Sequence, residues 1–180
     1  MNFTFTETNI AGLVIVKPET GSDARGTFSE TYKLSVFKAA GLGDVFVQEN
    51  RSVSARSVLR GLHFQHSPFA QTKLVSCGRG RVFDVAADLR PGSATFGKSF
   101  GVELTGENRL MLYIPAGFAH GFYALTDGAE VSYKCSAEYA PSHDAGVRWD
   151  DPDLAVAWPA GERILSAKDS ALPLLKDIKF

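Results

Sequence analysis

The chain has 180 residues, of which 44% are hydrophobic and 22% are charged, so its size and composition predict one compact domain over residues 1–180. Nineteen Lys and Arg residues stand against twenty Asp and Glu residues, and a net charge of −1 offers no broad cationic surface to a nucleic acid. The first residues lack the pattern of a signal peptide, and the apolar run Leu13–Val16 is too short to span a bilayer. We therefore expect no nucleic-acid partner, no membrane partner and a cytoplasmic location.

The two cysteines, Cys77 and Cys135, lie far apart in the sequence and do not form a C-x-x-C pair. A domain of this size does not depend on a disulfide for its stability, so we expect both thiols to be reduced. This expectation also favours the cytosol.

Short runs rich in Val, Phe, Ile and Tyr recur along the chain and are separated by Gly, Pro, Asn or Asp. This pattern is typical of an antiparallel sandwich or barrel, and it predicts an all-β fold. The predicted strands are Leu13–Lys17, Val45–Asn50, Ser57–Phe64, Lys73–Gly78, Arg81–Asp88, Ser99–Leu104, Leu110–Ile114, Gly121–Ala124 and Val131–Cys135.

Two segments depart from this pattern. In Ser29–Ala40 the apolar residues fall at spacings of three and four, and Gly41 follows as a C-terminal cap, which predicts one short N-terminal helix. After Asp150 the sequence becomes irregular, which indicates loops and a small helical tail. Trp149 and Trp158 are expected to pack this tail onto the barrel.

Polar residues on the predicted strands indicate where the barrel has a polar interior. Alternation places Gln48 and Asn50 on one face of their strand. In the next strand, simple alternation places Arg60 and His63 on opposite faces, but Gly61 lies between them and a glycine can mark a bulge that reorients the residues after it. The relative orientation of Arg60 and His63 stays open at this point.

A Pro-x-Gly-x-x-His sequence begins at Pro115 and ends at His120. The fixed backbone of Pro and the freedom of Gly are suited to directing the histidine toward the mouth of the following strand. This turn recurs in cupin barrels.

Six ordered blocks resemble the dTDP-4-dehydrorhamnose 3,5-epimerase family. The blocks are Arg60–Gln65, Lys73–Val75, Asp84–Arg90, Pro115–Phe122, Tyr133–Ser136 and Trp149–Pro152, and the match extends from about Gly12 to Asp169. The resemblance implies a cupin double-stranded β-helix, or jelly roll, that forms a homodimer. It also implies a sugar-nucleotide epimerase that acts on a dTDP-4-keto-6-deoxysugar without a cofactor or a metal.

The resemblance assigns the proton-transfer chemistry to a few residues. A 4-ketone acidifies the C–H bonds at C3 and C5, so epimerisation needs a base, an acid on the opposite face and donors for the enolate oxygen. By similarity His63 is the base, oriented by the carboxylate of Asp169, and Tyr133 is the acid. Lys73 is expected near the ketone oxygen, and His120 is expected to shape the same pocket.

The nucleotide half of such a substrate calls for charged and amide side chains. Arg25, Arg60 and Lys168 match family positions that contact the two phosphates, with Gln48 and Asn50 as neutral helpers. In a dimer, the segment that contains Arg25 is expected to reach the neighbouring subunit's site.

Four further residues are expected to contact the nucleotide. Glu30 matches a position that accepts hydrogen bonds from the nucleotide, and Phe28 and Tyr139 are candidate stacking faces for thymine. Asp144 stands where family members often carry the longer Glu, and Ala137-Glu138 stands where aromatic or polar residues are common. These two departures bear on the contacts made by Asp144 and Tyr139.

Three other functions compete with this reading. A metal-dependent cupin enzyme needs more ligands than two histidines. His66 is three residues from His63 and would face the other way in a regular strand, so only His63 and His120 could converge on a metal ion. A non-catalytic sugar-binding barrel needs the polar pocket but no paired base and acid. A single-centre epimerase is the third, although the presence of both His63 and Tyr133 favours epimerisation at C3 and C5.

Overall fold

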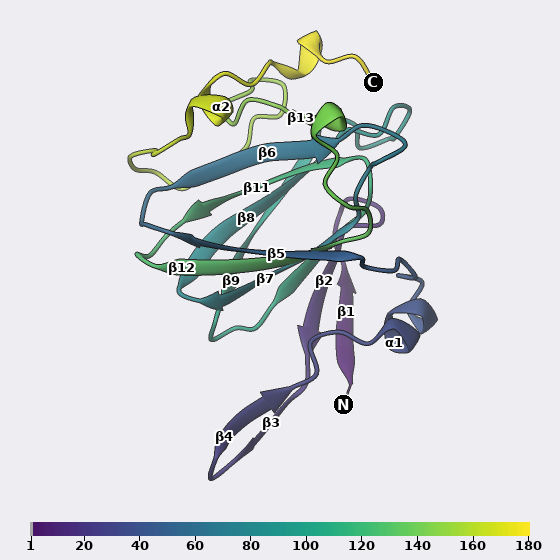
Figure 1. Cartoon of the computed structure of the whole chain (residues 1–180), viewed down its shortest axis with the longest axis vertical. Coiled ribbons are helices and arrows are strands. Elements are labelled where there is room, and N and C mark those ends of the chain that lie inside the picture. The colour runs from purple at the N-terminus through teal and green to yellow at the C-terminus, as the bar shows by residue number, and fades with distance from the viewer. Residues whose placement is uncertain (1) are drawn as a thin grey trace.

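The computed structural model describes residues 2–180, which form two antiparallel sheets that face each other (Figure 1). The six-stranded sheet contains, in spatial order, β1 (Phe3–Glu7), β2 (Val14–Pro18), β10 (Met111–Ile114), β7 (Lys73–Arg79), β12 (Ala129–Cys135) and β5 (Gln48–Ser54). The five-stranded sheet contains β13 (Asp144–Gly146), β6 (Leu59–Gln65), β11 (Phe118–Ala124), β8 (Arg81–Asp88) and β9 (Ser99–Thr105). The predicted all-β jelly roll of cupin type is confirmed.

The main core lies between the two sheets. Val75 and Val131 come from the six-stranded sheet, and Val82 and Phe122 come from the five-stranded sheet. All four belong to one cluster of buried side chains, because alternate residues of each strand point toward the opposite sheet.

The outer face of the five-stranded sheet is also buried, under the C-terminal segment, which explains why most residues of β8 are apolar. Val85 and Ala87 alternate with the inward-facing residues and pack with Leu154 and Leu175. Trp158 packs edge-on against Phe83 of β8.

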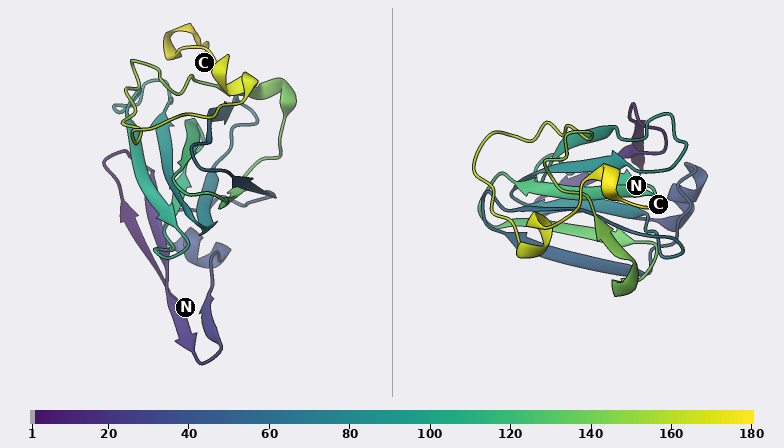
Figure 2. Two further views of the ribbon diagram at one scale, coloured as in Figure 1. Left: turned by 90° about the vertical axis from the view of Figure 1, so that its left-hand side faces the viewer. Right: turned by 90° about the horizontal axis from the view of Figure 1, so that it is seen from above.

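The C-terminal segment that follows β13 covers this outer face. It contains α2 (Ala167–Ser170) and the 3₁₀ helix η2 (Leu175–Asp177), and η1 (Pro141–His143) precedes β13. The indole Nε1 of Trp158 donates to the carbonyl oxygen of Trp149 at 2.8 Å, so the two tryptophans hold the segment together. In Figure 1 the segment lies beside β6, and the seen-from-above view of Figure 2 shows it arching over the sheets. The predicted small helical tail and its packing by tryptophan are confirmed.

The N-terminal region contains a hairpin that leaves the body of the molecule. Strands β3 (Thr20–Asp23) and β4 (Gly26–Ser29) pair only with each other, and they extend away from the two large sheets in both side views (Figures 1 and 2). The helix predicted over Ser29–Ala40 is shorter, because α1 spans Leu34–Ala39 and Ser29 belongs to β4. Gly41 follows the helix with φ +80°, as a C-terminal cap requires.

Every predicted strand is present, with shifted ends in most cases. The largest shift concerns the strand predicted at Val45–Asn50, which is β5 over Gln48–Ser54. The polar residues after Asn50 continue as strand because β12 offers a partner up to the pair Ala129↔Ser54. Four strands were absent from the prediction: β1, β3, β4 and β13.

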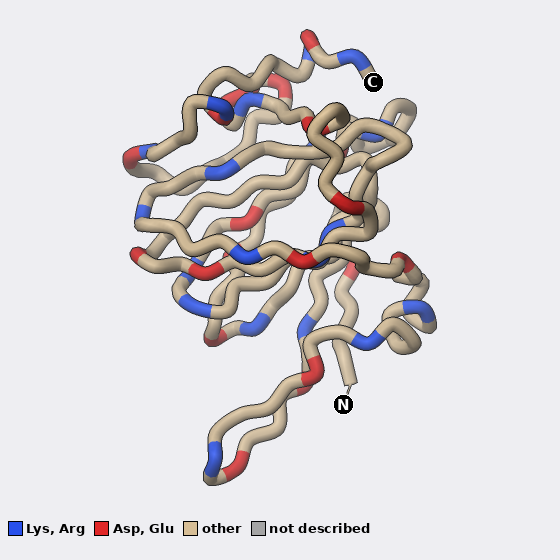
Figure 3. Tube along the Cα trace, viewed as in Figure 1, with Lys and Arg blue, Asp and Glu red and all other residues tan. Residues whose placement is uncertain are grey.

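Basic and acidic residues are interspersed along the whole trace in Figure 3. Within residues 2–180, no helix is long and apolar enough to cross a membrane. Cys77 and Cys135 are both buried and free, as expected.

Candidate active site

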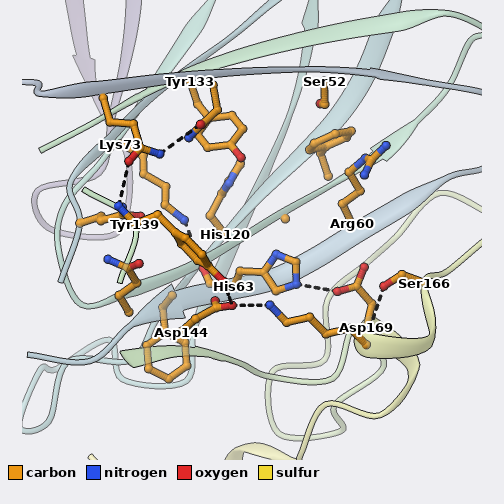
Figure 4. Close-up of a pocket in the computed structure, with 18 residues that line it drawn as sticks. Ser52, Arg60, His63, Lys73, His120, Tyr133, Tyr139, Asp144, Ser166 and Asp169 are labelled. Atoms are coloured by element: carbon orange, nitrogen blue, oxygen red, sulfur yellow. Dashed lines mark hydrogen bonds and ion pairs between the residues drawn. The ribbon is translucent and has the colours of Figure 1, made fainter. Parts of the chain in front are cut away.

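A cavity of about 320 Å³ lies between the two sheets, and Ser166, Lys168 and Asp169 of the C-terminal segment line part of it. Eleven of the fourteen predicted site residues line it, and Figure 4 shows their side chains converging on one space. These eleven are Gln48, Asn50, Arg60, His63, Lys73, His120, Tyr133, Tyr139, Asp144, Lys168 and Asp169.

His63 and Asp169 form a hydrogen-bonded pair on the wall made by the five-stranded sheet. The Nε2 of His63 lies 2.5 Å from Oδ1 of Asp169, whose side chain is 6% exposed, whereas the imidazole is 32% exposed to the cavity. Burial would raise the pKa of Asp169, but the hydrogen bond and charge of His63, with help from Ser166 and the N–H of Gly61, lower this pKa below its ordinary value. The carboxylate is therefore ionised at neutral pH and holds Nε2 as the proton-bearing nitrogen.

The orientation left open by the sequence is settled by a bulge in β6. His63 pairs with His120 and Arg60 pairs with Phe122, so three steps along β6 match two steps along β11. Gly61 sits in this bulge with φ +112°, and a Cβ atom there would lie 2.7 Å from the carbonyl oxygen of His120. The glycine is thus required, and it brings Arg60 and His63 to the same cavity.

Tyr133 belongs to the opposite wall. It lies on β12 of the six-stranded sheet, where it pairs with Asn50 and Val75. Burial raises the pKa of Tyr133, the nearby Cys135 raises it further, and Arg60 opposes the rise. The phenol is protonated at neutral pH, which is the form that a proton donor needs.

Lys73 is a buried cation-forming side chain inside the cavity. Its exposed fraction is 7%, and Nζ donates to the carbonyl oxygen of His63 at 3.4 Å. Burial lowers the pKa of Lys73, while Cys135, Asp144 and Asp84 pull it upward. A negative charge that develops on a bound molecule would favour the ammonium form in the same way.

His120 is paired with a second buried carboxylate. Its Nε2 lies 2.8 Å from Oδ1 of Asp84, on the neighbouring strand β8, and both side chains are buried. The imidazole ring of His120 stands 6.3 Å from the ring of Tyr133. His120 was predicted at the mouth of its strand, but it lies inside β11, because that strand already begins at Phe118.

Polar side chains from three segments meet at the opening of the cavity. Tyr139 donates from its hydroxyl to Asp144 at 2.9 Å, and Lys168 forms an ion pair with the same carboxylate. The backbone N–H of Tyr139 donates to the amide oxygen of Gln48 at 2.8 Å, and Gln48 in turn donates to Asn50 at 3.1 Å. Figure 4 shows Tyr139 and Asp144 of this group beside the His63–Asp169 pair.

Three predicted residues do not line this cavity. Arg25 lies in the β3–β4 hairpin turn, Phe28 is on β4 with 67% of its area exposed, and Glu30 follows that strand. Arg25 forms an exposed ion pair with Asp23 at 2.6 Å. The hairpin carries these residues away from the cavity of their own chain.

Seven lining residues were not among the predicted ones: Ser52, Phe64, Gln65, Gln71, Gly121, Phe122 and Ser166. Gln65 holds the loop that contains Tyr139, because its amide donates to the carbonyl oxygen of Glu138 and accepts from the N–H of Ala140. Its position two residues after His63 was the available signal. Ser166 accepts a hydrogen bond from the N–H of Asp169 at 3.0 Å, and the Ser-x-x-Asp spacing was its signal.

Within residues 2–180, no group of three or more His, Cys, Asp or Glu side chains is arranged to hold a metal ion. The two cavity histidines are instead each paired with one carboxylate, His63 with Asp169 and His120 with Asp84. A histidine–carboxylate pair and a phenol on facing walls, with the amino group of a lysine between the sheets, can remove and return a proton next to a carbonyl.

Comparison with known proteins places the chain among enzymes that epimerise nucleotide sugars. Residues 7–177 match the family model described as dTDP-4-dehydrorhamnose 3,5-epimerase. The dTDP-4-dehydrorhamnose 3,5-epimerase of Methanothermobacter thermautotrophicus is 49% identical over 93% of this chain and 91% of the relative. A dTDP-4-dehydrorhamnose 3-epimerase from Streptomyces niveus is 41% identical over 94% of this chain and 83% of the relative.

A solved structure extends the comparison to three dimensions. The crystal structure of dTDP-6-deoxy-D-glucose-3,5-epimerase from Legionella pneumophila, in complex with dTDP-4-keto-L-rhamnose, superposes with a TM-score of 0.96. The two chains are 45% identical, and the match covers 99% of this chain and 95% of the other. By sequence and by structure, this chain belongs to the dTDP-4-dehydrorhamnose 3,5-epimerase family.

Proposed function

We propose that this chain is an epimerase that converts dTDP-4-dehydro-6-deoxy-D-glucose to dTDP-4-dehydro-L-rhamnose by inverting C3 and C5. The observation that carries the proposal is the placement of His63 and Tyr133 on facing sheets of one cavity, with His63 Nε2 bonded to Asp169 and the phenol of Tyr133 held in its protonated form. A base and an acid on opposite sides of a sugar ring invert a carbon, because the proton leaves from one face and returns to the other.

The base in this mechanism is His63. Its Nε2–H donates to the ionised Asp169, which leaves the lone pair of Nδ1 to take the proton from C3 or C5 of the sugar. The C–H electron pair then moves into the ring to form an enolate, and the imidazolium that results is stabilised by the adjacent carboxylate. Asp169 stays ionised throughout and acts on the ring by charge and orientation.

The enolate oxygen requires a positive partner in a site with little water. Lys73 is the candidate, because its amino group is buried in the cavity and the growing negative charge opposes the desolvation that lowers its pKa, which favours the ammonium form. The hydroxyl of Tyr133 then delivers a proton to the opposite face of the carbon. No redox change occurs, and His63 and Tyr133 exchange their protons with solvent before the next cycle.

Residues at the opening are proposed to hold the nucleotide. Arg60 and Lys168 supply positive charge for the diphosphate, and Gln48 and Asn50 supply amide groups, all at the edge of the same cavity. The exposed ring of Tyr139 offers one stacking face for a nucleobase, and its hydroxyl is held by Asp144.

We infer further that the domain over residues 1–180 works as a homodimer. The β3–β4 hairpin projects from the body and carries the exposed Phe28 and Arg25, and neither residue lines the cavity of its own chain (Figure 1). A projecting hairpin of this kind is suited to reaching a second copy, where Arg25 would contact phosphate, Phe28 would cover the base and Glu30 would accept from the nucleotide.

Inversion at a single centre is the competing function within the family. One test decides between them: the chelator-treated protein is incubated with dTDP-4-dehydro-6-deoxy-D-glucose, and proton couplings at C3 and C5 are followed by NMR. Inversion at both carbons is expected. A product inverted at one carbon would identify a single-centre epimerase, and loss of activity that one added metal restores would favour the metal-dependent reading.

A further inference from the structure

Arg163 lies outside the cavity, in the segment that leads to α2, and its side chain is the centre of a folded loop. The Nη1 atom donates to the carbonyl oxygens of Gly161 and Glu162 at 2.8 and 3.1 Å, and Nη2 donates to the carbonyl oxygen of Pro159. Three backbone carbonyls therefore converge on one guanidinium. A planar group with several fixed donors can satisfy them together.

The same guanidinium ties this loop to the sheet. Its carbon Cζ lies 4.4 Å from the ring centroid of Tyr123 on β11 and 5.6 Å from that of Trp149. The hydroxyl of Tyr123 adds a hydrogen bond to the carbonyl oxygen of Glu162 at 3.1 Å. A cation over two aromatic rings and three carbonyl contacts together fix the position of residues 159–163.

The next residue attaches the segment to the strand that carries the proposed base. The N–H of Ile164 donates to Ser57, and the carbonyl oxygen of Ile164 accepts from Leu59, both at 2.9 Å. Leu59 begins β6, and His63 lies four residues further along that strand. On the other side, Ser166 follows Ile164 by two residues and caps α2 through the N–H of Asp169.

The helix that delivers Asp169 is too short to hold itself in place. It has four residues, and one turn of helix is unfavourable without support from the surrounding structure. Downstream, Arg148 and Asp151 hold the chain through the carbonyl oxygen of Pro173 and the N–H of Leu175. Upstream, the support is the loop gathered around Arg163.

From these contacts we propose that Arg163 is a positioning residue for the His63–Asp169 pair. It holds the entry to α2 against β11 and β6, and this fixes the distance at which the carboxylate meets the imidazole. The inference rests on the proposed function for its effect on turnover, but the geometry that it explains can be measured separately.

The test is Arg163→Lys, which keeps the positive charge and loses the planar set of donors. Turnover is expected to fall by roughly 10- to 100-fold, because Asp169 no longer holds the His63 imidazole in its reactive position. KM should change by less than about twofold. The matched control is Arg148→Lys in the same C-terminal segment; the Arg148 side chain is exposed and forms an ion pair with the exposed Asp150. This control should keep the wild-type kcat.

A second measurement separates positioning from a general loss of stability. The short His63–Asp169 hydrogen bond should give a proton NMR resonance far downfield of the amides in the wild type and in Arg148→Lys, and Arg163→Lys should lose it at a temperature where all three proteins are folded. If Arg163→Lys keeps this resonance and the wild-type kcat while its melting temperature falls, Arg163 only packs the loop and the inference is wrong. If the wild type shows no epimerase activity, the proposed function fails, and the resonance alone decides the inference.

Discussion

His63 Nε2 and Asp169 Oδ1 lie 2.5 Å apart although 106 residues separate them in the sequence. One residue stands on a strand of the five-stranded sheet and the other on a one-turn helix of the C-terminal segment. Their contact depends on the whole fold between them, and it fixes the tautomer of the proposed base.

Replacing Asp169 by Asn should lower kcat by roughly two to four orders of magnitude, because an amide neither fixes the tautomer nor stabilises the imidazolium. The affinity for dTDP should stay near the wild-type value, as measured by calorimetry. Asp150→Asn, an exposed carboxylate of the same segment, is the control. A kcat within threefold of wild type in Asp169→Asn would remove the pair from the mechanism.

Tyr133→Phe should separate proton removal from inversion. His63 can still exchange protons at the ring carbons, but no acid returns a proton from the opposite face, so epimerisation should fall by roughly 10²- to 10⁴-fold. Deuterium should therefore enter the sugar with its configuration retained. Tyr32→Phe, whose hydroxyl bonds to the backbone of Asp44 away from the cavity, should behave as wild type. Normal inversion by Tyr133→Phe would show that another group is the acid.

Lys73→Met should trade stability against activity. Removing the ammonium takes away the partner of the enolate oxygen, and kcat should fall by roughly 10²- to 10³-fold. The free energy of unfolding should stay equal or rise, because the methionine fills the same buried space without the desolvation cost of a charge. Both quantities are measured on one preparation, kcat by NMR and stability by urea titration. An active Lys73→Met protein would contradict the role of the cation.

Mixed dimers can test whether the hairpin serves a neighbouring site. One variant carries His63→Ala, and the other carries Arg25→Ala with Phe28→Ala; each should be inactive or weak alone. If the hairpin of one subunit completes the site of the other, a heterodimer has one site with all defects and one intact site. Random exchange of equal amounts should then restore roughly a quarter of the wild-type activity. No recovery, with heterodimers demonstrated by mass spectrometry, would show that the hairpin does not complete the neighbouring subunit's site.

Asp88 should stabilise the fold in a pH-dependent way. It is fully buried and bonds to Arg90, Ser93 and Thr95, and these partners outweigh desolvation and hold the pKa of Asp88 well below its usual range. A pKa lowered on folding gives stability that is present above the unfolded value of about 3.9 and is lost as the pH falls toward the folded value.

The variant Asp88→Asn should lose roughly 2 to 4 kcal/mol of unfolding free energy at pH 7, because it leaves charged and hydroxyl partners of a buried carboxylate incompletely bonded. The difference from wild type should shrink as the pH falls below 4. Urea titrations at several pH values follow it. A constant difference across the range would mean that the ionised form of Asp88 is not what stabilises the fold.

Sequence reasoning reached the fold class and most of the site because both depend on local patterns. Alternating apolar residues and Gly- or Pro-containing turns mark the strands, and six ordered blocks mark the family. The β3–β4 hairpin was missed because it is polar and built around Gly21 and Gly26. The strand β1 was missed although Phe3 and Phe5 alternate with threonine, which is the pattern of a strand. Their pairing is set by the partner strand, which a short window of sequence does not contain.

The orientation within β6 was beyond the sequence for a similar reason. Gly61 permits a bulge, but the bulge exists because β11 approaches so closely that a side chain at this position would collide with it. The contact of Lys168 with Asp144 likewise depends on two segments that meet only in the folded chain. The role of Arg163 gave no sequence signal, because its partners are backbone carbonyls and ring faces.

The central claim is that His63 removes the protons next to the ketone. It is tested most directly by incubating the protein with dTDP-4-dehydro-6-deoxy-D-glucose in heavy water and following deuterium at C3 and C5 by NMR, beside His63→Ala and the control His66→Gln. We expect incorporation at both carbons for the wild type and for His66→Gln, and none for His63→Ala. Incorporation that persists in His63→Ala would contradict it.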